Sequence, residues 1–242
     1  MNVRKIRQVV LDTETTGMNK IGVLYEGHRI IEIGAVEIIN RRLTGRNFHV
    51  YIKPDRLIDP EAYSIHGISN DYLLNKPTFA QISDKFLKFI SGSELIIHNA
   101  PFDIGFIDYE FSKLNLNIPK TEIFCKITDS LEIARSLFPG KRNSLDALCS
   151  RYAIDNTKRI LHGALLDSQI LAEVYLIMTG GQTAFTFSIE SRDNETSYAR
   201  KVKRIFRRTY KLKVIRANTK ELAEHEHCLD LVHNNYCLWR DK

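Results

Sequence analysis

The sequence contains no long apolar run. None of its hydrophobic stretches approaches the roughly 18 residues that a membrane-spanning helix requires. The N-terminal residues MNVRKIRQ also lack the apolar segment of a signal peptide. The sequence therefore predicts a protein that stays in the cytoplasm.

Cysteine is scarce, and its spacing is uninformative. The four cysteines form no C-x-x-C pair and stand at Cys125, Cys149, Cys228 and Cys237. Paired spacing is typical of zinc sites and redox motifs, so its absence argues against both. We expect free thiols that are buried or incidental.

Excess charge is absent from most of the chain. Residues 1–180 carry 22 Lys and Arg against 21 Asp and Glu, whereas residues 181–242 carry 13 against 8. Most of the net charge of +6 therefore lies in the C-terminal part. The hydrophobic content of 43% is typical of a globular protein with a sizeable core.

The hydrophobic pattern predicts an α/β domain. Apolar runs at 8–12, 29–38 and 48–53 predict three strands in an antiparallel meander. A capping-box pattern at Thr78 and Gln81 precedes a predicted helix at 79–90. The remaining expected elements are a strand at 94–98, a short extended stretch at 122–126, and helices at about 101–115, 129–137, 144–152 and 163–178. Together they predict a mixed sheet flanked by helices.

A change in composition marks the end of this domain. Gly180 and Gly181 end the last predicted helix, so we place the domain at 1–180. The polar residues 181–199 predict a flexible linker. Residues 200–242 contain too few apolar residues for an independent core, which predicts a segment that folds against a partner.

Two carboxylates stand at the end of the first predicted strand. Asp12 and Glu14 are two residues apart, so their side chains share one face and Thr13 points to the other. Two like charges on one face are costly unless a cation lies between them. For a D-x-E pattern by itself, a solvated strand end is the alternative.

Two more acids begin the apolar faces of predicted helices. Asp103 lies four residues before Ile107, and Asp167 precedes Ile170 and Leu171 on one helix face. Placement near the positive end of the helix dipole is the alternative for either acid alone. Because we find no matching set of inward-facing Lys or Arg, the four acids predict a site for hard divalent cations.

One histidine precedes the last of these acids. His162 lies five residues before Asp167, about 140° around a helix, so the two do not share a helical face. We therefore place the imidazole on the loop before Gly163, from which it reaches the acids. A solvated loop histidine is the alternative.

Three segments resemble the motifs of a known enzyme family. VLDTETTG at 10–17, HNAPFD at 98–103 and HGALLD at 162–167 resemble the exonuclease motifs of the DEDDh 3′-5′ exonucleases, whose fold is ribonuclease H-like. Further stretches, including IIEIGAV, KRNSLDALC and DSQILAEVYL, resemble the family of proofreading epsilon subunits of bacterial DNA polymerase III. This resemblance runs from about residue 8 to residue 182 and implies a five-stranded mixed sheet with a C-terminal docking tail.

The resemblance implies hydrolysis of a DNA 3′ end with two divalent cations, Mg²⁺ or Mn²⁺. Asp12 would bridge both ions, Glu14 and Asp167 would complete their protein ligands, and Asp103 would act partly through metal-bound water. His162 would accept a proton from the attacking water.

The resemblance also implies contacts to the terminal nucleotide. Besides Asp12, Glu14 and Asp167, the residues expected there are Glu61, His66, His98, Asn99 and Phe102. For His66, an ordinary turn residue in IHGIS is the alternative.

The C-terminal part resembles docking segments. QTAFTF looks like a motif that binds the sliding clamp, with Gln182, Phe185 and Phe187 as the contacts, although so short a match can arise by coincidence. Residues 200–216 hold nine Lys or Arg and no acid, which is typical of a solvated face or a nucleic-acid contact. Their interleaved apolar residues favour docking instead, and the resemblance implies the polymerase catalytic (alpha) subunit as partner. It further implies a small theta-like subunit on the exonuclease domain.

Two other functions remain open from the sequence. One is an exoribonuclease of the same fold that trims RNA 3′ ends, because the motifs do not separate DNA from RNA. The other is a mainly structural subunit of the polymerase.

Overall fold

The structure is a computed structural model that describes residues 6–114, 116–157, 159, 161–180 and 215–231. These residues fall into two units, an α/β domain and, separately, helix α9 (Thr219–Leu231). The predicted linker at 181–199 and most of the predicted docking segment at 200–242 lie outside the described residues. No helix in the described ranges is long and apolar enough to cross a membrane.

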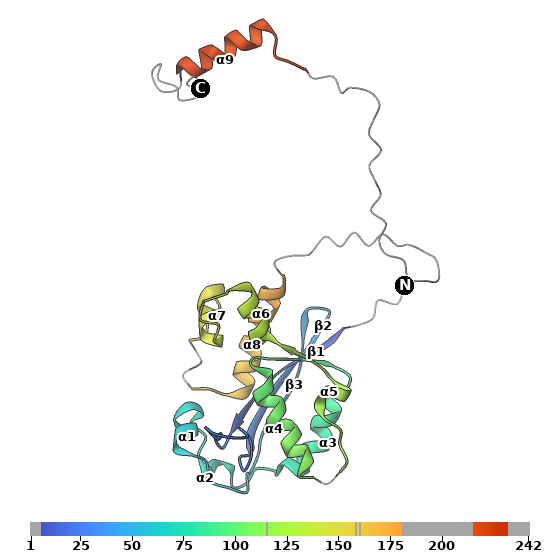
Figure 1. Cartoon of the computed structure of the whole chain (residues 1–242). Coiled ribbons are helices and arrows are strands. Elements are labelled where there is room, and N and C mark those ends of the chain that lie inside the picture. The colour runs from blue at the N-terminus through green and yellow to red at the C-terminus, as the bar shows by residue number, and fades with distance from the viewer. Residues whose placement is uncertain (1–5, 115, 158, 160, 181–214, 232–242) are drawn as a thin grey trace, which may run out of the picture. The chain divides into compact units, whose positions relative to one another are not determined.

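A five-stranded sheet forms the centre of the α/β domain (Figure 1). Its order is β3-β2-β1-β4-β5, where β1 (Arg7–Thr15), β2 (Ile30–Ile39) and β3 (Arg42–Tyr51) are the predicted antiparallel meander. Strands β4 (Glu94–Ile97) and β5 (Lys126–Asp129) are parallel to β1. Strand β1 is therefore central and covered on both faces.

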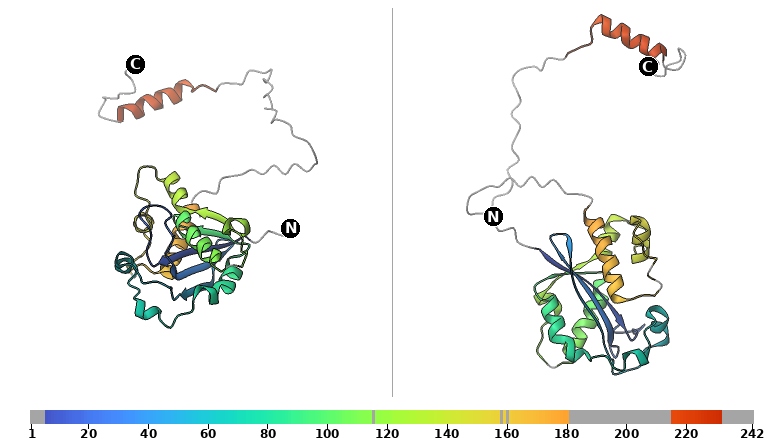
Figure 2. Two further views of the ribbon diagram at one scale, coloured as in Figure 1. Left: turned by 60° about the horizontal axis from the view of Figure 1, so that its bottom comes forward. Right: turned by 180° about the vertical axis from the view of Figure 1, so that it is seen from behind.

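Helices cover both faces of the sheet (Figures 1 and 2). One face packs against α3 (Phe79–Ile90), α4 (Ala100–Ser112) and α5 (Thr121–Phe124). The other packs against α6 (Ser130–Leu137), α7 (Leu145–Tyr152) and α8 (Ala164–Gly180). The two cores alternate along β1, because Leu11 belongs to the first and Val10 to the second.

Most predicted elements are confirmed, with ends shifted by a few residues. The capping box of Thr78 and Gln81 is present at the start of α3. The extended stretch predicted at 122–126 is wrong, because α5 occupies most of it and β5 begins at Lys126. The reason is a long-range contact: the Asp108 carboxylate accepts hydrogen bonds from the backbone and the hydroxyl of Thr121 and anchors this turn.

Besides α5, three short or exposed helices among the described residues were not predicted. Helices α1 (Pro60–His66) and α2 (Asn70–Leu73) follow β3, and a small core of Ile31, Ile58, Ile68 and Leu73 holds them together. Helix α9 buries none of its side chains. Short apolar runs of this kind carry too little periodicity to be identified as helices.

The two strands beside β1, β2 and β4, pair with different lengths of it. Parallel pairing with β4 covers only Gln8 to Val10, so from Leu11 to Thr15 strand β1 is paired with β2 alone. Ligands bind in such α/β sheets where the carboxyl ends of adjacent parallel strands diverge. The fold therefore leaves room beside Asp12 and Glu14.

Candidate active site

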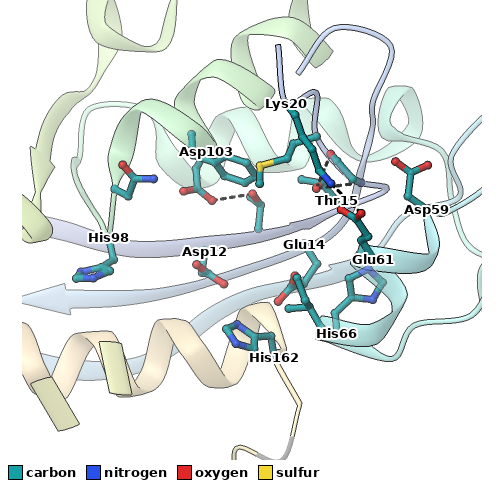
Figure 3. Close-up of a pocket in the computed structure, with 17 residues that line it drawn as sticks. Asp12, Glu14, Thr15, Lys20, Asp59, Glu61, His66, His98, Asp103 and His162 are labelled. Atoms are coloured by element: carbon teal, nitrogen blue, oxygen red, sulfur yellow. Dashed lines mark hydrogen bonds and ion pairs between the residues drawn. The ribbon is translucent and has the colours of Figure 1, made fainter. Parts of the chain in front are cut away.

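A cavity of about 280 Å³ lies at this end of β1 (Figure 3). It collects the sequence-predicted residues Asp12, Glu14, Glu61, His66, His98, Asn99, Phe102, Asp103 and His162. Asp167 lines an adjoining cavity that it shares with Asp12 and His162. Side chains from four separate segments thus meet at one place.

The strand places its acids as the alternation predicted. Thr13 points toward α4, where its hydroxyl donates a 2.7 Å hydrogen bond to the Asp103 carboxylate. Asp12 and Glu14 are on the opposite face, the face that Val10 presents to α8. Figure 3 shows Asp12 with Asp103 on one side and His162 on the other.

Asp103 reaches the site from the first turn of α4. That helix begins at Ala100 after β4 ends at Ile97, so its first turn lies beside the open edge of β1. Only 3% of Asp103 is exposed. Burial raises the pKa of Asp103 to about 7, even though Thr13 donates to its carboxylate.

Asp167 is brought to the strand by close packing of α8 on β2. The backbone of Gly34, the β2 partner of Asp12, touches the start of this helix so closely that a Cβ there would collide with Ala164. Ser168 donates a 2.7 Å hydrogen bond to the Gly34 carbonyl. The sequence signal was the glycine inside a strand, which indicates close approach of another backbone.

Glu32 was not among the predicted site residues, yet its carboxylate caps the start of α8. Its carboxylate accepts a hydrogen bond from the backbone N–H of Ala164 at 3.2 Å and lies 2.7 Å from Nε2 of His49. A negative charge at the positive end of a helix is stabilising. Glu32 thereby fixes the first turn of α8, which carries Asp167.

His162 lies on the segment before α8, as predicted, and is exposed. Its Nδ1 is 3.3 Å from the Asp167 carboxylate. Ligand atoms of Glu14, His162 and Asp167 lie within 4.8 Å of one another, close enough to bind one metal ion.

The expected lack of a matching set of basic side chains holds for three of the four acids among the described residues, but Asp167 has a basic partner that the sequence did not indicate. The side chain of Arg159 is only 6% exposed. It pairs with Asp167 at 2.5 Å and with Asp146 at 2.7 Å. Its Nη2 also donates to Nδ1 of His162 at 2.8 Å. No sequence pattern indicated this contact, because Arg159 precedes α8 in a polar stretch without periodicity.

Arg159 does not neutralise the whole cluster. Burial, followed by repulsion from Asp103, Glu14 and Asp167, raises the pKa of Asp12 well above its ordinary value. Burial raises the pKa of Glu14 to about 8, and the nearby Glu32 adds to this.

Asp167 is the exception among the acids. Burial alone would raise its pKa, but neighbouring His162 and Arg159 hold it below its ordinary value. Within the described part of the chain the other three carboxylates form no ion pair, and their oxygens are the hard donors that divalent cations prefer. The donor set therefore fits a hard divalent cation.

The residues expected around a nucleotide form the rest of the pocket wall. His66 ends α1 and is buried, with Nδ1 accepting from the backbone of Ile68 in the turn that follows. His98 lies beside Ser130 at 3.0 Å, and burial lowers the pKa of both histidines. The rings of Phe102 and Phe106 are in tilted contact, with 4.9 Å between their centroids.

Some lining residues were missed by the sequence analysis. Met18, Ala62 and Ile65 add apolar surface to the pocket, and Lys20 pairs with Glu61 at 2.8 Å near its mouth. These residues lie in the loop after β1 and in α1, where no sequence pattern pointed to a site. Gln182, Phe185 and Phe187, which were expected to bind the sliding clamp, lie outside the described residues.

Comparisons with known proteins cover nearly the whole chain. The model of a family described as Exonuclease matches residues 9–175. The chain is 63% identical to DNA polymerase III subunit epsilon of Escherichia coli (strain K12), over 99% of this chain and 100% of that protein. It is 54% identical to the subunit of the same name from Haemophilus influenzae, over 96% and 94% of the two chains.

Solved structures agree with this fold. Exonuclease X in complex with 5′ overhanging duplex DNA is 26% identical, with a TM-score of 0.54 over 72% of this chain and 91% of that chain. The E. coli ExoI–ssDNA complex is 18% identical, with a TM-score of 0.63 over 74% and 41%. The second likeness shows a shared fold only.

Proposed function

Because the chain belongs to the exonuclease family and, within it, to the DNA polymerase III epsilon subunits, we propose that it removes mispaired nucleotides from DNA 3′ ends. The observation that carries this proposal is the meeting of Asp12, Glu14, Asp103, His162 and Asp167 at the end of β1. Such a set, gathered from three segments, suits phosphodiester hydrolysis.

The carboxylates are proposed to hold two divalent cations, Mg²⁺ or Mn²⁺. Asp12, Glu14 and Asp167 would be the main protein ligands, and Asp103 would support them from α4. When bound, such ions stabilise negative charge on the attacking and leaving oxygens of the phosphodiester. The raised pKa values of Asp12 and Glu14 support this assignment, since burial and repulsion from neighbouring carboxylates outweigh the attraction of Arg159 at both groups.

His162 is proposed as the general base. Nη2 of Arg159 lies 2.8 Å from Nδ1, and because a guanidinium has only donors, this Nδ1 is placed to accept a hydrogen bond. A neutral imidazole is the form that accepts a proton from the attacking water. For Nδ1 to act as the base, Arg159 has to withdraw from it.

The pocket wall is proposed to bind the terminal nucleotide. Phe102 and Ile65 offer apolar surface to a base, while His98, Asn99 and Glu61 offer polar atoms. A mispaired end enters such a pocket at lower cost, because less base pairing and stacking is lost. This difference would produce the preference for mismatches.

The C-terminal part is proposed to hold the enzyme at the replication machinery. Gln182, Phe185 and Phe187 would bind the sliding clamp, and residues 200–242 would bind the polymerase catalytic (alpha) subunit. The supporting facts are the motif itself and the nine basic residues interleaved with apolar ones at 200–216. A theta-like subunit is proposed on the exonuclease domain.

The test uses the full chain and a 5′-labelled primer with a 3′-terminal mismatch. We expect Mg²⁺- or Mn²⁺-dependent release of deoxynucleoside monophosphates, faster than from a matched end, and a loss of roughly 10³-fold in Asp12→Asn, or about 4 kcal/mol. Faster degradation of a matching RNA would favour the exoribonuclease. A chain that binds polymerase but leaves the primer uncut would favour the structural role.

A further inference from the structure

A second groove continues from the active-site pocket. His98 and Asn99 line both, so the two are joined at this wall. From there the groove, with a volume of about 640 Å³, runs along α6 and the loop between α6 and α7. Its other lining residues are Leu131, Arg135, Gly140, Lys141, Asn143 and Ser144, none of them acidic.

The groove carries two uncompensated positive charges. Arg135 and Lys141 are exposed, and neither forms an ion pair with any residue in the described part of the chain. The other cations near the pocket are already paired: Lys20 with Glu61 at 2.8 Å, and Arg159 with two carboxylates. Positive charge near the active site is therefore available on the groove side.

The loop that carries Lys141 is held in place. Arg151 of α7 donates to the Asn143 side chain at 3.1 Å and to the Arg142 carbonyl at 2.8 Å. Its guanidinium also lies 4.1 Å from the ring centre of Phe138. These contacts fix the groove wall before any ligand binds, which lowers the entropic cost of binding.

From this arrangement we propose that the groove binds the sugar-phosphate backbone of the nucleotides that precede the terminal one. The inference rests on the proposed exonuclease function. A strand whose last nucleotide fills the pocket carries a negative charge on each preceding phosphate, and the acids of the pocket repel those charges. Free Arg and Lys side chains attract them and release counterions.

The test compares two substrates of the full-length chain with Mn²⁺. One is a single-stranded DNA oligonucleotide, and the other is the p-nitrophenyl ester of thymidine 5′-monophosphate, which has no preceding nucleotide. In the double variant Arg135→Gln/Lys141→Gln, the ratio of kcat/KM for the oligonucleotide to that for the ester should fall about tenfold. The slope of log kcat/KM for the oligonucleotide against log salt should become shallower by about 1.4, or 0.7 for each lost phosphate contact.

The matched control is Lys85→Gln/Lys120→Gln, which removes two exposed cations that line neither cavity. It should keep the ratio and the salt slope of the unaltered chain. An unaltered chain that cleaves neither substrate overturns the proposed function itself. If the unaltered chain cleaves both substrates and Arg135→Gln/Lys141→Gln has the same kcat/KM ratio, only the groove proposal is overturned.

A third readout separates nucleic acid from a protein partner. Binding of a fluorescent oligonucleotide in EDTA should weaken in the groove variant and stay the same in the control. Unchanged oligonucleotide binding combined with weaker association with the other polymerase subunits would make the groove a protein-binding surface and overturn the proposal.

Discussion

The guanidinium of Arg159 donates two hydrogen bonds to the carboxylate of Asp167, from Nε at 2.5 Å and from Nη2 at 2.8 Å. Paired N–H donors of this kind match a carboxylate closely and occupy both of its oxygens. A metal ion that binds Asp167 needs the same oxygens. Arg159 and the metal ion therefore compete.

Arg159→Gln should bind Mn²⁺ about tenfold more tightly than the unaltered chain in the absence of substrate, a gain of about 1.4 kcal/mol. The metal-free variant should be less stable by up to about 3 kcal/mol, because buried Asp167 loses its guanidinium partner and keeps only His162 beside it. Titration calorimetry with Mn²⁺ and thermal melts measure the two effects. Arg151→Gln, which touches no acid of the site, is the control. Weaker Mn²⁺ binding in Arg159→Gln would mean that Arg159 supports the metal site instead of competing with it.

Without metal, the free energy of unfolding should decrease as pH rises from about 4.5 to about 8. The folded state holds protons on Glu14, with a pKa of about 8, and on Asp103, with a pKa of about 7, and the unfolded chain releases them near their ordinary values. Stability from these groups is thus complete below about pH 4 and is lost as pH rises through the folded pKa values.

Melting temperatures across this pH range, in EDTA and in Mn²⁺ or Mg²⁺, test this prediction. The ion should remove most of the decline, because it supplies the missing counter-charge. The double variant Glu14→Gln/Asp103→Asn should show a shallower decline in EDTA, because of the three acids only Asp12 then keeps a raised pKa. A metal-free unaltered chain whose stability rises over this window would contradict the assignment of raised pKa values.

Gly34→Ala should push the start of α8 away from β2. Its Cβ would collide with the backbone of Ala164 and Leu165, and overpacking of this kind costs about 1–3 kcal/mol. Because Asp167 moves with the helix, kcat/KM should fall at least tenfold while Mn²⁺ binding weakens. The control is Gly163→Ala, one residue before α8, where an added Cβ meets nothing within 4 Å. Equal activity in the two variants would show that the contact at Gly34 does not set the position of Asp167.

His162→Gln should lower kcat by roughly 10²–10⁴-fold, the usual contribution of a general base. Mn²⁺ binding, measured by calorimetry, should be retained in large part because the carboxylates remain. His227→Gln on the exposed helix α9 serves as the control for a histidine outside the site. An unchanged rate at neutral pH would remove His162 from the mechanism.

Local sequence patterns predicted a large share of the fold and of the site. Thr78 and Gln81 marked the start of α3 because a capping box needs only neighbouring residues. Asp103 and Asp167 stood out because a charge at the start of an apolar helix face is unusual. Helix α5, in contrast, depends on Asp108, which lies 13 residues from Thr121 and gives no local signal.

The sequence by itself determined that Asp12 and Glu14 share one face of a strand, because side chains in a strand alternate with a period of two. It also determined that two helices begin with an acid on their apolar face. Only the tertiary structure decided that Arg159 lies against Asp167, that Glu32 caps α8 and that Gly34 lets this helix approach the strand. These three relationships join residues through space, and neither periodicity nor composition records which distant side chains will meet.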